Sequence, residues 1–136
     1  MAVELSMESG SVLTLYWDMD GVNEGIASDF RTSEEKRFIF PGHPVDVTSR
    51  ADWNKFIGVP VSDINLAWHV PNERCAQMPW SYHFVFSDDV SLVVALGEDE
   101  GSGLAYMPDA LVVILDKEIA IKYKIPASKT SSCGYP

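Results

Sequence analysis

The segment from Trp80 to Leu115 constrains the fold more than any other part of the chain. Its first aromatic residues recur at every second position, as Trp80, Tyr82, Phe84 and Phe86. A β-strand points alternate side chains to one face of a sheet with this same period of two. We therefore expect a strand from Trp80 to Phe86 that buries these four aromatic side chains on one face.

A nearly continuous apolar run, from Val90 to Leu96, follows across the turn at Ser87-Asp88-Asp89. Continuous apolar character is typical of a central strand that is buried on both faces. The two runs predict an antiparallel hairpin, and either a helix or a second sheet must cover its second strand.

Turn residues and apolar periodicity predict further elements. Val3 to Trp17 reads as a first hairpin with its turn at Ser9-Gly10, and Ile64 to Val70 and Leu111 to Leu115 read as strands. We expect Gly21 to Arg37 to be a polar connection with a helical turn around Ser33 to Glu35. Glu98 to Gly103 is predicted to be an acidic loop, and Asp116 to Tyr123 either a short helix or a final strand.

A short helix is predicted between Ser49 and Gly58. Ser49 fits the N-cap, Asp52 stands at the capping-box position three residues later, and Gly58 and Pro60 end the helix. The apolar face that we expect to pack on the sheet consists of Trp53, Phe56 and Ile57.

The chain has 136 residues and is 46% hydrophobic, which suffices for one domain with its own core. We expect a single compact α+β domain over residues 1–126, mainly antiparallel β-sheet, sandwich-like or curled, with one or two short helices. Residues 127–136 are small and polar and are predicted to be a loosely ordered tail.

The chain carries 20 acidic and 10 basic residues, for a net charge of -10. This charge repels nucleic acid and anionic lipid and favours basic partners, so we expect no nucleic acid and no membrane as partners. Glu4 and Glu8 lie where a signal peptide needs positive charge, and no apolar run is long enough to span a membrane. Cys75 and Cys133 lie far apart, which predicts free thiols and a cytoplasmic protein.

The acidic residues form two blocks, one before Arg31 and one between Arg74 and Lys117, neither of which contains a basic residue. Such clustering favours fast, selective encounter with a basic protein, as in small inhibitors and immunity-type proteins. The hypothesis assigns partner binding to Asp88, Asp89, Glu98, Asp99, Glu100 and Asp109. The alternative is that these charges only keep the protein in solution.

A second hypothesis is a small-molecule site, in which aromatic side chains line a pocket that favours cationic ligands. The residues assigned to it are Trp17, Trp53, Trp68, Trp80 and Tyr82. The alternative is that they fill the core.

Leu13 to Val22 forms an apolar run that ends in Asp18-Met19-Asp20-Gly21. This segment is similar to the first motif of the haloacid dehalogenase superfamily of phosphatases. The resemblance implies a Mg²⁺-dependent reaction in which Asp18 attacks phosphorus and Asp20 handles the leaving-group proton. The later metal-binding motif would then be Asp88 and Asp89.

The superfamily builds a parallel sheet from alternating strands and helices, whereas the strands of this chain are joined by short hairpins. We therefore favour an acidic turn that closes a strand, with Gly21 supplying its backbone angles. We predict a non-enzymatic protein without catalytic residues.

Metal sites fit the sequence poorly. An EF-hand loop that begins at Asp18 needs glycine at its sixth position and glutamate at its twelfth, whereas Gly21 is the fourth residue and Asp29 the twelfth. His69 and His83 match no zinc spacing with their neighbours. We expect both histidines to be strand residues that hydrogen-bond to a neighbour, and we expect no metal and no cofactor. A homodimer through a sheet edge or aromatic contacts is compatible with the sequence.

Overall fold

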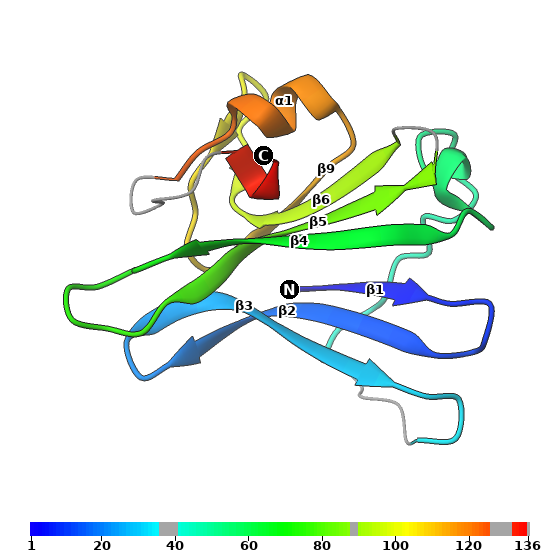
Figure 1. Cartoon of the computed structure of the whole chain (residues 1–136), viewed down its shortest axis with the longest axis horizontal. Coiled ribbons are helices and arrows are strands. Elements are labelled where there is room, and N and C mark those ends of the chain that lie inside the picture. Colours follow the sequence, from blue (N-terminus) through cyan, green and yellow to red (C-terminus); the bar gives the residue numbers. More distant parts are fainter. Residues whose placement is uncertain (36–40, 88–89, 126–131, 136) are drawn as a thin grey trace.

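Two antiparallel sheets lie face to face, and a helix with the C-terminal segment covers the outer face of the second sheet (Figure 1). The computed structural model describes residues 1–35, 41–87, 90–125 and 132–135. The first sheet has the order β1-β2-β3, and its strands are β1 Ala2–Ser6, β2 Val12–Asp20 and β3 Asn23–Arg31. The second sheet has the order β4-β5-β6-β9, and its strands are β4 Val61–His69, β5 Met78–Phe86, β6 Ser91–Leu96 and β9 Leu111–Ile114.

Smaller elements complete the described part of the chain. They are the hairpin of β7 Glu98–Asp99 and β8 Leu104–Ala105, the helix α1 Lys117–Lys122, and the 3-10 helices η1 Asn54–Phe56 and η3 Ser132–Gly134. The predicted fold class, a single α+β domain dominated by antiparallel sheet, is confirmed.

The predicted first hairpin is present. β1 pairs with β2 in the register Val3↔Leu15, and the turn is closed by the bond from the Gly10 amide to the Met7 carbonyl at 2.9 Å. Gly10 has a φ of +83°, a conformation that glycine adopts without the steric cost of a side chain.

The prediction of a polar connection from Gly21 to Arg37 was wrong, because most of it is strand β3. This strand pairs with β2 over nine positions, from Val12↔Arg31 to Asp20↔Asn23. Most of its residues are small or polar, and Ile26 is its only fully buried large apolar side chain. β3 is stabilised by pairing with β2 and by packing on β5, and neither contact can be predicted from the residues of β3 alone.

Packing on β5 also explains why residue 25 is a glycine. Its φ lies outside the left-handed region, so the backbone conformation does not require one. A Cβ added at Gly25 would lie 2.7 Å from Cβ of Met78 and 3.2 Å from the carbonyl oxygen of Pro79. The two sheets therefore approach so closely at this point that only glycine fits between them.

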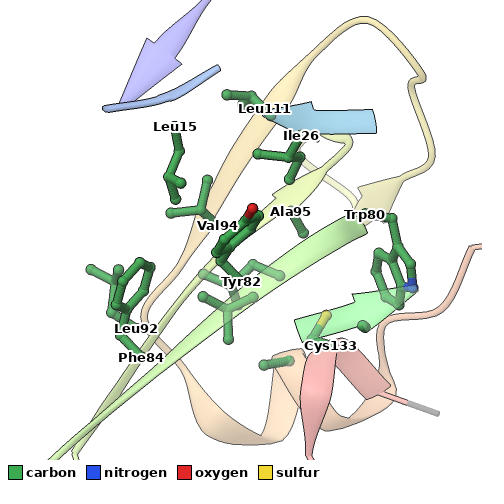
Figure 2. Close-up of a cluster of buried hydrophobic side chains, with 14 of the residues drawn as sticks. Leu15, Ile26, Trp80, Tyr82, Phe84, Leu92, Val94, Ala95, Leu111 and Cys133 are labelled. Atoms are coloured by element: carbon green, nitrogen blue, oxygen red, sulfur yellow. The ribbon is translucent and has the colours of Figure 1, made fainter. Parts of the chain in front are cut away.

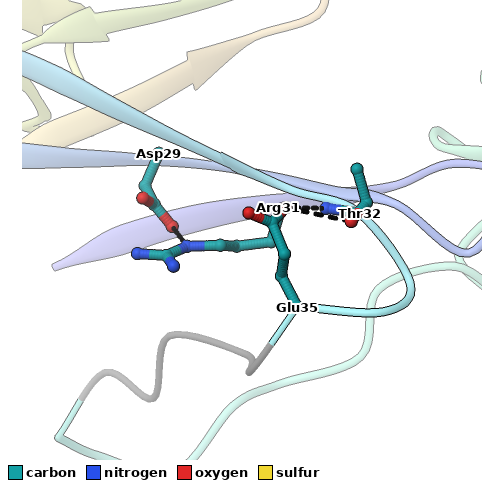
Figure 3. A network of polar contacts seen from close by, with 4 residues as sticks. All are labelled: Asp29, Arg31, Thr32 and Glu35. Atoms are coloured by element: carbon teal, nitrogen blue, oxygen red, sulfur yellow. Dashed lines mark hydrogen bonds and ion pairs between the residues drawn. The ribbon is translucent and has the colours of Figure 1, made fainter.

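Beyond β3 the chain turns at Thr32 to Glu35, within the polar network of Figure 3. The Thr32 amide and hydroxyl both donate to the Glu35 carboxylate, at 2.8 and 2.9 Å, and these bonds lower the pKa of that carboxyl. Arg31 pairs with Asp29 at 2.7 Å (Figure 3). The helical turn expected here is a single hydrogen-bonded turn, closed from the Glu35 amide to the Thr32 carbonyl.

The predicted hairpin in the second sheet is confirmed as β5 and β6, with Tyr82 opposite Val94 and Phe84 opposite Leu92. Every residue of β6 from Leu92 to Leu96 is buried. The sequence predicted either a helix or a second sheet as the cover of this strand, and the structure has both. The first sheet lies on one face of the second sheet, and α1 with η3 lies on the other (Figure 1).

The expectation that Trp80 shares a face with the other aromatic residues of β5 was wrong. The register between β4 and β5 shifts after Ala67↔Ser81 to Trp68↔Pro79, which leaves Trp80 as an extra residue in a bulge. A bulge re-aims the side chain that it contains. Trp80 accordingly packs against Tyr123, which follows α1, with ring centroids 6.0 Å apart.

One part of the core lies between the two sheets, and another, with Trp80 and Cys133, lies between the second sheet and the C-terminal elements (Figure 2). Leu15 and Ile26 come from the first sheet, and Tyr82, Phe84 and Val94 come from the second. Burial of these side chains supplies the main driving force for joining the two sheets.

The helix predicted between Ser49 and Gly58 is reduced to η1, and Ser49 is not its cap. Trp53 is the N-cap without a side-chain hydrogen bond, while Asp52 lies 3.7 Å from Arg50. Phe56 is buried and lies 5.1 Å from the ring of Phe86, as expected for a face that packs on the sheet. Ile57 on the same predicted face is 54% exposed, because a single 3-10 turn cannot direct all three apolar side chains inward.

Of the two alternatives for Asp116 to Tyr123, the helix is present. Asp116 is the N-cap, and its carboxylate accepts from the Ile119 amide at 2.9 Å. The short side chain of an N-cap aspartate satisfies a helix amide that has no partner in the helix itself.

Part of the predicted loose tail packs on the second sheet. Cys133 is fully buried, and the Tyr135 ring stacks on His83. These contacts hold the described residues 132–135 against β4 and β5. The boundary at residue 126 stays a prediction.

Candidate acidic interface

The acidic segment predicted as a loop from Glu98 to Gly103 is instead a small hairpin of β7 and β8, which we call the acidic hairpin (residues 98–105). Glu98 pairs with Ala105 and Asp99 with Leu104. The Glu100 amide donates to the Gly103 carbonyl at 3.0 Å, and the Gly101 amide donates to the Asp99 carboxylate at 2.8 Å. These bonds order the tip while leaving the side chains of Asp99 and Glu100 exposed.

A buried tyrosine anchors the root of the acidic hairpin. The Tyr123 hydroxyl donates to the carbonyls of Leu96 at 2.6 Å and Ala105 at 3.2 Å. The hydroxyl occupies the space that a side chain at Gly97 would need. Burial raises the pKa of Tyr123, so this hydroxyl stays a donor across the physiological pH range.

Asp109 is exposed in the connection between β8 and β9. The neighbouring Ala110 accepts a hydrogen bond from the Gly97 amide at 3.0 Å, directly before Glu98. The backbone therefore brings the Asp109 connection to the root of the acidic hairpin.

A residue that the sequence-based hypothesis did not include joins the two acidic blocks. Tyr106, inside the second block, donates from its hydroxyl to Oε1 of Glu24, inside the first, at 3.0 Å. Burial and the adjacent carboxylate raise the pKa of Tyr106. The one signal in the sequence that points to Tyr106 is its position directly after the acidic hairpin.

Among the described residues, the ion pairs lie away from these acidic groups. They join Arg31 to Asp29, Arg50 to Asp52 and Lys122 to Glu118. No ion pair within the described ranges involves Asp99, Glu100 or Asp109. The negative charge of the acidic hairpin and the Asp109 connection therefore faces solvent without a matched cation in that part of the chain.

The remaining predicted partner-binding residues are placed differently. Glu98 is half-buried at the root of the hairpin. Asp88 and Asp89 lie outside the described residues.

The aromatic residues assigned to a ligand pocket are spread over the molecule. Trp80 is fully buried and Tyr82 is 9% exposed, so both belong to the core, on opposite sides of β5. Trp17 is half-buried beside Ile26, Trp53 packs on Phe56, and Trp68 is 39% exposed. The contacts of the five residues do not bring them into one group, and their role in ligand binding stays a prediction.

The Asp18-x-Asp20 segment lies at the end of β2, in an antiparallel hairpin. Asp18 is opposite Gly25, Asp20 is opposite Asn23, and the Asp18 carboxylate accepts from the Met19 amide at 2.8 Å. The sheets of the described residues are antiparallel, unlike the parallel sheet that the phosphatase resemblance implies. Since Asp88 and Asp89 lie outside the described part, the second half of the resemblance is not placed.

The phosphatase resemblance implies a Mg²⁺ ion bound by carboxylates of Asp18-x-Asp20 and of the later motif at Asp88 and Asp89. In residues 1–35, 41–87, 90–125 and 132–135, no group of three or more His, Cys, Asp or Glu side chains is placed to hold a metal ion.

Both strand histidines have hydrogen-bonded neighbours, as predicted. Nε2 of His69 lies 3.0 Å from the Glu24 carbonyl oxygen, and Nδ1 of His83 lies 3.4 Å from the Gly134 carbonyl oxygen. Burial lowers the pKa of both imidazoles, so both are neutral at pH 7. Cys75 and Cys133 are free thiols, as expected.

Known protein families, curated proteins and solved structures were compared with the chain, and none of them matches it. Among the described helices, none has the length and apolar character needed to cross a membrane. The class that the fold and the site define is an acidic β-sandwich with a small, charged hairpin.

Proposed function

We propose that this is a non-enzymatic acidic protein that binds a basic protein partner, in the manner of a small inhibitor or an immunity-type protein. The observation that supports the proposal best is the acidic hairpin, whose exposed carboxylates have no matched cation among the described residues. Unpaired charge on an ordered element attracts an oppositely charged surface and fixes how the two proteins dock.

The anchoring of the hairpin supports the same role. Tyr123 bonds to both Leu96 and Ala105, and the Tyr106–Glu24 bond ties the following segment to β3. An interface on an anchored element loses little conformational entropy when it binds, so more of the interaction energy appears as affinity. The proposal also keeps the protein in the cytoplasm, where Cys75 and Cys133 remain reduced.

The test is affinity capture from a lysate of the source organism, at low and then physiological salt, followed by binding kinetics with the purified captured protein. We expect a basic partner in near-stoichiometric amount, with an association rate constant that falls as salt rises because exposed charges are screened. The double variant Asp99→Lys/Glu100→Lys should lower the association rate constant by roughly 10-fold or more.

The matched control is Glu8→Lys/Glu34→Lys, which changes the net charge equally at exposed residues outside the acidic hairpin. Because steering depends on the local field, this control should retain most of the association rate. If both double variants lowered the association rate constant equally, the partner would be attracted by the overall negative charge and not by the acidic hairpin in particular. Unchanged binding in both would remove the basis of the proposal.

A further inference from the structure

The C-terminal residues 132–135 cover a polar part of the second sheet. Cys133 is fully buried, and the Tyr135 ring lies over His83 with centroids 3.9 Å apart and planes inclined by 26°. The Tyr135 hydroxyl also bonds to the hydroxyl of Ser91 on β6. We call residues 132–135 the C-terminal latch.

The groups under the C-terminal latch are incompletely satisfied. Ser81 and His83 on β5 are 0% and 4% exposed. Ser81 Oγ faces only the Cys133 thiol, a weak hydrogen-bonding group, and His83 Nε2 has no hydrogen-bond partner among the described residues. A buried polar atom without a partner costs free energy that contact with water would recover. Opening of the latch would admit water to both atoms.

The backbone of the C-terminal latch is also strained at its buried residue. Cys133 has a φ of +50°, in the left-handed region that residues other than glycine and asparagine rarely adopt. The closed position is thus stabilised by the Tyr135 contacts and burial of Cys133, and it is opposed by strain and by the unsatisfied atoms beneath.

The protonation state of His83 bears directly on this balance. Nδ1 donates to the Gly134 carbonyl, so in the neutral ring Nε2 is a bare acceptor. Protonation would add a second N–H and a positive charge at Nε2, where no acceptor lies within the described residues. The closed latch therefore accommodates the neutral imidazole better than the imidazolium.

The charged and titratable groups around His83 come from three elements. Asp63 on β4 favours the imidazolium, and Lys117 on α1 opposes it. Tyr135 of the latch stacks on the imidazole, and Cys133 is uncharged at neutral pH because burial raises the pKa of its thiol to about 12. Burial is the largest influence on His83 and lowers its pKa.

We propose that the C-terminal latch is a pH-sensitive cover, which closes on the second sheet while His83 is neutral and opens when His83 is protonated. Opening exposes a polar stripe of the sheet formed by Ser81, His83 and Ser91. The inference does not rest on the proposed acidic interface.

The direction of the pH effect follows from linkage. In the open form His83 is solvated and has the ordinary pKa near 6.5, above its value in the closed form. Well above that pH both forms are neutral and the opening equilibrium is constant. Below it the open form binds protons preferentially, and at pH 5 the open population rises by at most about 30-fold.

The thiol of Cys133 reports opening, because it is inaccessible in the closed form. In a Cys75→Ser background, Cys133 is the remaining thiol, and its reaction rate with 4,4′-dithiodipyridine is measured at each pH. Dividing this rate by the rate of glutathione at the same pH corrects for the pH dependence of the thiol chemistry. We expect this ratio to rise several-fold from pH 7.5 to pH 5.0. His83→Gln should abolish the rise, whereas His69→Gln, on the opposite face of the second sheet, should retain it.

Hydrogen exchange of the protein without substitution provides a second measurement that needs no variant at His83. Amides of the C-terminal latch should exchange faster at pH 5.0 than at pH 7.5 after correction for intrinsic rates. At both pH values they should also exchange faster than amides of β6, which open only when the whole protein unfolds. A thiol ratio that does not depend on pH would overturn the proposal. So would the same rise in His83→Gln, or equal corrected exchange rates in the latch and in β6, which would indicate that the latch opens only when the whole protein unfolds.

Discussion

Tyr106 donates a hydrogen bond to Oε1 of Glu24 across 82 residues of sequence, at 3.0 Å. This bond joins the connection between β8 and β9 to the first sheet, and its acceptor is a half-buried carboxylate. Hydrogen bonds to charged acceptors in partly buried positions are stronger than those between neutral groups. The bond is therefore a charge-assisted polar contact between the two acidic blocks of the sequence.

Tyr106→Phe is expected to lower the free energy of unfolding by about 1 to 2 kcal/mol, because it removes the donor and leaves the ring in place. Urea denaturation measures the change. In a double-mutant cycle with Glu24→Gln, the two losses should not add, since both substitutions weaken the same bond. Additive losses would show that the two side chains act separately.

Phe84→Ala should destabilise the protein by roughly 3 to 5 kcal/mol, because it opens a cavity between the two sheets. Phe84 is fully buried, whereas Phe30 on β3 is 57% exposed. The matched substitution Phe30→Ala should change the free energy of unfolding by about 0.5 kcal/mol or less. Similar losses at both positions, measured by urea denaturation, would contradict the placement of the core.

Gly25→Ala should cost about 2 kcal/mol, because its new Cβ would overlap Cβ of Met78 on the facing sheet. Gly21→Ala is the comparison, since its position has a φ of +66° and no atom within 4 Å of an added Cβ. There only backbone strain is introduced, of about 1 kcal/mol. Thermal or urea denaturation should rank Gly25→Ala as the more damaging, and the reverse order would argue against the close approach of β3 and β5.

The stability of the protein is expected to fall as pH drops from 7.5 to 5.5. Burial lowers the pKa of His69 in the folded state, whereas the unfolded chain has the ordinary value near 6.5. Below pH 6.5 the unfolded state binds the proton more readily, so folding loses at most about 1.4 kcal/mol from this group at pH 5.5. Above pH 6.5 the group has no such effect.

Urea midpoints at the two pH values test this expectation, with His69→Gln as the variant. The variant should lose less stability between pH 7.5 and pH 5.5 than the unsubstituted protein. Equal losses would mean that other groups are responsible for the pH dependence.

Local patterns in the sequence predicted several elements correctly. The alternation in β5, the apolar run of β6 and the Ser9-Gly10 turn all depend on neighbouring residues alone. The helix α1 was one of two alternatives, and the N-cap bond of Asp116 is the local interaction that favours it. These features follow from backbone preferences that act within a few residues.

The acidic interface was only partly predictable. Asp99, Glu100 and Asp109 were identified from charge clustering, and the structure places all three on the surface. Tyr106 and Glu24 were missed because no pattern within either segment indicates that they meet. The predicted helix after Ser49 is shortened to η1, whose N-cap is Trp53, while Asp52 lies near Arg50 and does not cap the helix.

The sequence by itself determined that this chain forms antiparallel hairpins with a strongly apolar central strand and a large excess of acidic charge. Tertiary structure alone decided that residues 23–31 form a strand, that Trp80 turns away from the other aromatic residues of β5, and that Cys133 is buried. The physical reason is that periodicity and capping act between near neighbours. Strand pairing, bulges and the covering of a sheet depend instead on which distant segments the stacked sheets bring together.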